Sequence, residues 1–288
     1  MKKSYLKYFS SLLLFGSNGI IASYILLNSY EIVFLRSLIG GLFLIAVFIL
    51  SKNKITFLNN KKHFIYAIIS GVAMGISWML LYEAYVKIGV SIATLLYYCG
   101  PVIVMIVSPF IFNERFTTYK IVGFIIVFIG MFLVNENILG EAKFSIGLLY
   151  GILGAVMYAV LVVFNKKAET IKGLENTIIQ LISSVLIVAI FVQIKQGLMI
   201  PSLMDNIIPV LFLGVVNTGI GCYLYFSSIQ NLPAGSVAIC GYIEPLSALI
   251  FSAIFLGERL SPIQMLGALC IIGGAMLAEL SELKKQIN

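Results

Sequence analysis

Side chains that commonly catalyse reactions or bind metals are scarce in this chain. Its 288 residues contain one histidine, His63, and one aspartate, Asp205, and only 11% of the residues are charged, against roughly 25% in soluble domains. The four cysteines show no CxxC spacing, so we expect free thiols and neither a disulfide framework nor a metal site. A glycine-rich phosphate loop with its lysine is missing from the sequence, which argues against direct coupling to ATP. No cofactor is expected.

Apolar residues, in contrast, make up 60% of the chain and gather in long stretches. Stretches of about 18 or more apolar residues favour membrane-spanning helices over the core of a soluble protein, and they lack the alternation of outer-membrane strands. We therefore predict an all-α integral membrane protein. Its ten predicted spans cover residues 5–28, 30–51, 63–86, 90–112, 117–135, 144–164, 174–195, 205–229, 234–256 and 262–281.

The net charge of +7 is distributed unevenly over the loops between these spans. With both termini in the cytoplasm, most basic residues lie on the cytoplasmic side, and the external segments carry Lys87, Lys143, Lys195 and Arg259. Because basic loops resist translocation, the asymmetry sets the orientation and does not indicate a nucleic-acid partner. We expect a multi-pass protein of the cell (inner) membrane whose partners are lipid and a small molecule. The sequence leaves the oligomeric state open and is compatible with a monomer.

Residues 82–134 return, without a gap, as residues 226–278 at a constant offset of 144. We predict two five-helix repeats, residues 1–140 and residues 141–288. An odd number of spans in each repeat makes the second one enter the membrane from the opposite side, and secondary transporters use such inverted repeats for alternating access. The matching pairs are Tyr98 and Tyr242, Pro101 and Pro245, Ser108 and Ser252, Glu114 and Glu258, Arg115 and Arg259, Gly123 and Gly267, and Gly130 and Gly274.

Several short motifs also carry a resemblance to a known family. They are Gly16-Ser17-Asn18, Phe34-Leu35-Arg36, Tyr242-Ile243-Glu244-Pro245-Leu246, Gly257-Glu258-Arg259-Leu260-Ser261, and the glycines Gly267, Gly273 and Gly274. Over nearly its whole length the chain resembles the EamA-type transporters of the drug/metabolite transporter (DMT) superfamily, with Asn113 as a small departure where the pattern has glycine. The resemblance implies ten helices, a central cavity and transport of small metabolites such as amino acids or their relatives.

Pro101 and Pro245 fall near the middle of the fourth and ninth predicted spans. Each proline removes an amide donor and clashes with the preceding turn, so the carbonyls of Tyr97 and Gly241 need other partners. Within a bilayer such a break is tolerated only against protein or a wet cavity. We interpret the prolines as helix breaks that flank a binding site, with a simple packing kink as the alternative.

Glu244 is the strongest single candidate for a functional residue. A carboxylate midway along a span is costly, by roughly 2.5–3.5 kcal/mol on insertion scales, and it can exchange a proton there or face a substrate ammonium group. Arg36, in the second span, cannot lose its proton and must reach water, a carboxylate or freed carbonyls. It is suited to bind a substrate carboxylate, and its counterpart in the second repeat is Gln180. A structural tie between Glu244 and Arg36, or an arginine that reaches the interface, is the alternative.

Glu83 and Lys87 share one face near the external end of the third span. They form either a surface ion pair or a gate, and Glu83 is the second candidate for proton coupling. The pairs Glu114-Arg115 and Glu258-Arg259 are interpreted as structural, because a glutamate at the start of the following helix interacts favourably with the helix dipole.

Two spans carry stripes of small, polar and aromatic residues at helical spacing. Small residues allow close helix packing, and aromatic rings also bind cations or other rings, so both functions stay open. The stripes are Gly214, Asn217, Thr218, Gly221 and Tyr225 in the eighth span, and Gly71, Gly75, Trp78, Tyr82 and Tyr85 in the third. The predicted inner wall includes further tyrosines, Tyr97, Tyr98, Tyr158 and Tyr242. The predicted substrate-binding residues are Asn18, Arg36, Trp78, Tyr82, Tyr97, Asn217, Thr218, Tyr242 and Glu244.

These features favour a secondary active transporter of small polar metabolites, with amino acids or amines preferred and proton coupling open. A flippase for lipids or lipid-linked sugars with the same fold is the first alternative. An integral membrane enzyme is the second, and the shortage of catalytic groups argues against it.

Overall fold

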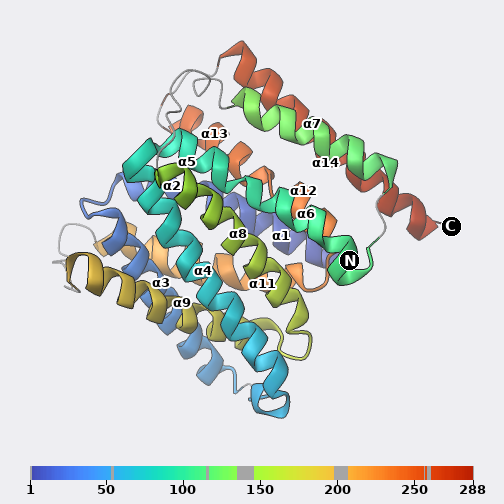
Figure 1. Ribbon diagram of the computed structural model, residues 1–288. Coiled ribbons are helices and arrows are strands. Elements are labelled where there is room, and N and C mark those ends of the chain that lie inside the picture. The colour runs from blue at the N-terminus through green and yellow to red at the C-terminus, as the bar shows by residue number, and fades with distance from the viewer. Residues whose placement is uncertain are drawn as a thin grey trace.

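The computed structural model describes residues 2–52, 55–114, 117–134, 146–197, 207–255, 257 and 261–287, and these ranges contain no strand. Helices fill almost all of them (Figure 1). The first half contains α1 (Lys2–Gly16), α2 (Asn18–Ser23), α3 (Ser29–Leu50), the short turn η1 (Phe57–Asn59), α4 (Lys61–Ile88), α5 (Val90–Tyr97), α6 (Cys99–Phe112) and α7 (Thr118–Val134). The second half contains α8 (Ile146–Lys167), α9 (Gly173–Gln196), α10 (Ile207–Phe212), the π-helix η3 (Leu213–Ile220), α11 (Gly221–Ile229), α12 (Ala234–Cys240), α13 (Ile243–Phe255) and α14 (Pro262–Ile287).

Within the described residues, seven helical stretches are long and apolar enough to cross a membrane. They are Ser29–Leu50, Lys61–Ile88, Ile92–Phe112, Ile146–Lys167, Gly173–Gln196, Ile207–Ile229 and Ala234–Phe255. Two shorter apolar helices, Thr118–Val134 and Pro262–Ala278, add to them. The outer surface also carries large apolar side chains, such as Phe110 and Leu26, which are 85% and 84% exposed. Large apolar side chains on the outside suit a protein that is surrounded by lipid.

Three of the predicted spans are interrupted in the structure. The first is divided at Ser17, between α1 and α2; the fourth at Tyr98, between α5 and α6; and the ninth at Gly241 and Tyr242, between α12 and α13. The last two breaks lie just before Pro101 and Pro245, and each proline occupies the third position of the helix that follows. Amides in a first helical turn have no acceptor within their own helix, so proline is tolerated there.

Glycines allow α7 and α14 to pack closely along one edge of the molecule, where the two helices lie side by side (Figure 1). A Cβ atom on Gly123 would lie 2.5 Å from the carbonyl oxygen of Gly274, and one on Gly130 would lie 2.7 Å from that of Gly267. As the residue number rises along α7 it falls along α14, so the helices are antiparallel. The 144-residue offset converts each of these glycine pairs into the other, which makes the contact symmetric.

Candidate functional site

A cavity lies among the interrupted helices. It is bounded by both halves of the chain and by residues at or next to all three breaks. The lining residues are Phe15, Asn18, Arg36, Met74, Trp78, Tyr97, Tyr98, Pro101, Tyr158, Leu161, Asn217, Thr218, Cys222, Tyr225, Phe226, Gly241 and Glu244.

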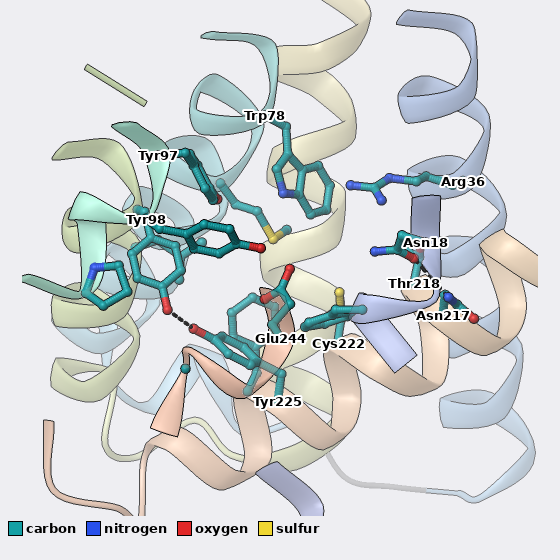
Figure 2. Close-up of a pocket in the computed structure, with 17 residues that line it drawn as sticks. Asn18, Arg36, Trp78, Tyr97, Tyr98, Asn217, Thr218, Cys222, Tyr225 and Glu244 are labelled. Carbon is teal, nitrogen blue, oxygen red and sulfur yellow. Dashed lines mark hydrogen bonds between the residues drawn. The ribbon is translucent and has the colours of Figure 1, made fainter. Parts of the chain in front are cut away.

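Glu244 projects its carboxylate into the middle of this cavity (Figure 2). The residue lies in the first turn of α13, and its main-chain amide donates to the carbonyl oxygen of Gly241 at 3.1 Å. The break at Gly241 and Tyr242 therefore sets the position from which the carboxylate leaves the backbone. Within the described part of the chain, the carboxylate forms no hydrogen bond or ion pair with another side chain.

Arg36 faces the same cavity from α3, and its residue is only 8% exposed. The guanidinium carbon lies 4.3 Å from the centre of the Trp78 ring, a distance at which a cation is attracted to the face of an indole. Its Nε atom is buried without a hydrogen-bond partner. Among the described residues no carboxylate pairs with it, so the alternative of an Arg36–Glu244 ion pair is not observed. The side chain lines the cavity.

Asn217 connects the π-helix to the break in the first span. Its Nδ2 atom donates to the carbonyl oxygen of Leu14 at 2.8 Å, to Ser17 Oγ at 2.9 Å and to Asn18 Oδ1 at 2.9 Å. Thr218 donates within the π-helix to the carbonyl oxygen of Leu213 at 2.9 Å. Such wide turns are rare and are frequent at functional sites. Because Oδ1 of Asn18 is held by Asn217, its amide nitrogen points into the cavity beside the guanidinium (Figure 2).

Tyrosine rings form the wall opposite these polar groups. The hydroxyls of Tyr158 and Tyr225 lie 3.1 Å apart (Figure 2), and the ring of Tyr97 packs edge-on against Tyr98 and Tyr158, with centroids 6.1 and 5.8 Å apart. The stripe on the eighth span is buried in the structure: Gly214, Asn217, Thr218, Gly221 and Tyr225 all face the interior. The cavity thus has one aromatic side and one side rich in hydrogen-bond donors.

Two of the nine predicted substrate-binding residues do not line the cavity. Tyr242 is fully buried and donates from its hydroxyl to the carbonyl oxygen of Tyr98 at 2.8 Å. Tyr82 packs against Tyr85 with ring centroids 5.3 Å apart, in a separate apolar cluster. The other seven meet at the cavity: Asn18, Arg36, Trp78, Tyr97, Asn217, Thr218 and Glu244.

Several apolar lining residues were not predicted from the sequence. Their positions follow the helical period, since Phe15 precedes Asn18 by three residues and Met74 precedes Trp78 by four. A side chain three or four positions from a lining residue shares its face. The same rule identifies Cys222, which lies four positions after Thr218. The unpredicted lining residues are Phe15, Met74, Leu161, Cys222 and Phe226.

The predicted pairing of Glu83 with Lys87 is wrong. Glu83 is buried, accepts a hydrogen bond from the Tyr30 hydroxyl, and pairs with the Lys195 ammonium at 2.7 Å. Lys87 is exposed on α4. A four-residue spacing brings two side chains of one helix to the same face. The carboxylate of Glu83 instead pairs with a lysine on a neighbouring helix, α9. Glu83 therefore connects α4 to α3 and α9 outside the cavity lining.

Glu114 also has a different partner from the expected one. Its carboxylate accepts the amides of Ala234 at 2.6 Å and Gly235 at 3.0 Å, so it caps the start of α12 and not of α7, the next helix in the sequence. Nearby, Lys166 donates to the carbonyl oxygens of Ile229 and Leu232. These contacts tie the ends of α6 and α8 to the hairpin between α11 and α12. The other three members of the predicted pairs, Arg115, Glu258 and Arg259, lie outside the described residues.

Comparisons with known proteins agree with this architecture. The EamA-like transporter family model matches the chain twice, at residues 2–136 and 145–280. "Uncharacterized transporter YxxF" of Bacillus subtilis (strain 168) is 27% identical over 271 residues, 93% of this chain and 86% of that protein. Human "Solute carrier family 35 member G1" is 25% identical over 245 residues, 80% of this chain and 66% of that protein.

A solved structure titled "Crystal structure of protein" has the same fold. It superposes with a TM-score of 0.81 at 18% identity, over 96% of this chain and 98% of that one. The matched family consists of membrane transporters and not of enzymes, in agreement with the apolar helices. The chain therefore belongs to the EamA-like transporter family of the drug/metabolite transporter superfamily, and it is a multi-pass membrane protein.

Proposed function

We propose that this protein is a secondary active transporter of small polar metabolites, with amino acids or amines preferred. Ten spans in two inverted repeats, residues 1–140 and 141–288, would carry solute across the cell (inner) membrane by alternating access, with both termini in the cytoplasm. The observation that carries the proposal is a cavity between the two halves that is lined by Arg36 and Glu244, two groups of opposite charge that form no ion pair with any described residue. Buried charges that no protein group neutralises are costly, and a polar solute would offset that cost.

Symmetric contacts support alternating access. The glycine contacts between α7 and α14 exchange under the repeat offset, and Tyr242 bonds to its own counterpart, Tyr98. Two halves that meet through equivalent surfaces can adopt two nearly equivalent arrangements, one open to each side of the membrane. The breaks next to Pro101 and Pro245 place irregular backbone at the cavity, which is where a bilayer tolerates it.

Proton coupling is assigned to Glu244 and not to Glu83. The Glu244 carboxylate faces the cavity and pairs with no side chain in the described ranges, so a proton and a solute ammonium group would compete for it. Glu83 pairs with Lys195 and accepts a hydrogen bond from Tyr30. Both contacts favour its ionised form, so we do not expect it to exchange a proton during transport. The cavity residues Asn18, Trp78, Tyr97, Asn217 and Thr218 complete the proposed binding site.

The test uses the purified full-length chain reconstituted in lipid vesicles. A mixed metabolite pool is supplied with an imposed pH gradient, and the vesicle contents are compared with those of protein-free vesicles by mass spectrometry. Selective accumulation of polar metabolites is expected, and collapsing the gradient then shows whether protons drive it. Equal contents in both kinds of vesicle, together with movement of labelled lipid between leaflets, would replace the proposal with the flippase alternative.

A further inference from the structure

We propose that the cavity contains two half-sites of opposite charge, and that its solute is a small zwitterion. The anionic group of the solute binds Arg36 and Asn18, and its ammonium group binds Glu244. A proton on Glu244 replaces the ammonium group when a solute lacks one. This inference rests on the proposed transport function and narrows it, because it excludes simple amines as preferred solutes.

The half-site at Arg36 offers hydrogen-bond donors and no negative charge. The guanidinium group has five N–H donors and no acceptor, and its carbon lies over the Trp78 ring. Its Nε atom has no partner although the residue is only 8% exposed. The Asn18 amide nitrogen also points into the cavity, because Asn217 donates to Oδ1 of the same amide (Figure 2). Converging donors around a fixed positive charge are suited to a carboxylate.

The half-site at Glu244 offers a carboxylate and no positive charge of its own. Arg36 is the charged side chain that acts on it across the cavity, and the other titratable groups around it are phenols and a thiol, which are uncharged at neutral pH. These groups come from the first helix, α4, the break between α5 and α6, α8 and α11. They are Tyr8, Tyr85, Tyr97, Tyr98, Tyr158, Tyr225 and Cys222.

The repeat shows that the fold itself does not require either charge. The counterpart of Arg36 is Gln180, whose amide bonds to Ser70 and Asn176 at 2.6 and 3.0 Å. The counterpart of Glu244 is Gly100, which packs directly against Tyr158. Two equivalent helix positions are thus built without charged residues, so packing does not account for the charges in the cavity.

Charge neutrality then decides which solutes bind well. A zwitterion neutralises both half-sites at once, so no proton is needed. A carboxylate without an amine neutralises Arg36 but leaves a second negative charge in a region of low dielectric constant, so Glu244 takes a proton from solution. An amine without a carboxylate leaves Arg36 unpaired, and arginine cannot lose its proton in compensation. A proton can replace the ammonium group, but nothing in the cavity replaces the carboxylate.

The experiment measures binding to the full-length protein in detergent by titration calorimetry. The standard amino acids are screened, and the tightest binder is compared with its analogues that lack the ammonium or the carboxylate group. Loss of the carboxylate should weaken binding by about tenfold or more at every pH. The analogue without the ammonium group should bind with net proton uptake, seen in buffers of different ionisation enthalpy, and should bind more weakly as the pH rises.

Variants assign these effects to the two residues. Glu244→Gln should abolish proton uptake with the deaminated analogue, whereas Glu169→Gln, which neutralises an exposed carboxylate on the loop after α8, should not. Arg36→Gln should weaken binding of the zwitterion by about tenfold or more. Arg36→Lys keeps the positive charge but lacks the planar guanidinium group, so it should recover part of the affinity. Thermal denaturation confirms that each variant is folded.

Three results would overturn the inference: an amine that binds as tightly as the zwitterion, a deaminated analogue that binds without taking up a proton, or no binding by any amino acid. Uptake of the same labelled compounds into vesicles separates this inference from the transport function. Binding without uptake contradicts transport and keeps the half-sites. Equal uptake of zwitterion and amine keeps transport and contradicts the half-sites.

Discussion

The hydroxyl of Tyr242 donates a 2.8 Å hydrogen bond to the main-chain oxygen of Tyr98, the residue that holds the same place in the other repeat. Both residues lie at helix breaks, where carbonyl groups lose their regular helical partners,. The rings are also close, with centroids 6.4 Å apart. This bond joins the two breaks directly beside the cavity, because Tyr98 is a lining residue. It ties the two halves together at their centre.

Tyr242→Phe tests the contribution of this bond to stability. The substitution keeps the buried ring and removes the donor, so the free energy of unfolding should fall by about 1–2 kcal/mol. The measurement is thermal denaturation in detergent, with Tyr24→Phe, at a residue that is 64% exposed, as the control. Identical melting temperatures for Tyr242→Phe and the parent would show that the bond does not stabilise the fold.

Gly123→Ala should separate α7 from α14. The new Cβ atom would lie 2.5 Å from the main-chain oxygen of Gly274, which cannot rotate away as a flexible side chain would. We expect a loss of about 1–3 kcal/mol, as for other overpacked sites. Gly273→Ala is the matched control on α14, since its Cβ atom would meet nothing within 4 Å. If both variants have the melting temperature of the parent, the helices are not in close contact at Gly123.

Asn217→Ala should weaken solute binding without a direct change to either charge. The variant removes the donor that holds Leu14, Ser17 and Asn18, so the Asn18 amide can turn away from the cavity. A lost hydrogen bond to a charged solute group corresponds to about tenfold in the dissociation constant. Asn231→Ala, at an exposed turn, is the control. An unchanged dissociation constant for Asn217→Ala would exclude this positioning role.

Neutralising the two candidate carboxylates should give different pH profiles of uptake. Glu244→Gln removes the carboxylate that faces the cavity, so the dependence of uptake on pH should be lost. Glu83→Gln removes a carboxylate that is already paired with Lys195, so the variant should keep the pH dependence and lose stability. A Glu244→Gln protein with the pH profile of the parent would exclude Glu244 from proton coupling.

Much of this protein could be predicted from properties that are local in the chain. Hydropathy indicates apolar helices, because each membrane span must satisfy its own backbone hydrogen bonds. The repeated pattern and the family motifs indicate the family that the comparisons show. Charged residues are rare inside the spans, and this rarity singled out Arg36 and Glu244. A charged residue within a bilayer is costly and usually has a functional or structural role. Hydropathy, helical spacing and the repeat offset are all properties of the linear chain.

Only the tertiary structure decided which groups meet. Hydropathy placed Arg36 and Glu244 in the membrane, but packing brings the arginine over the Trp78 ring and leaves the carboxylate in the cavity without a side-chain partner among the described residues. Glu83 pairs with Lys195, and Glu114 caps α12, each across helices that are distant in the sequence. A helical period shows which face a side chain occupies, whereas its partner depends on the helix that packs against that face. That choice is made by the whole fold.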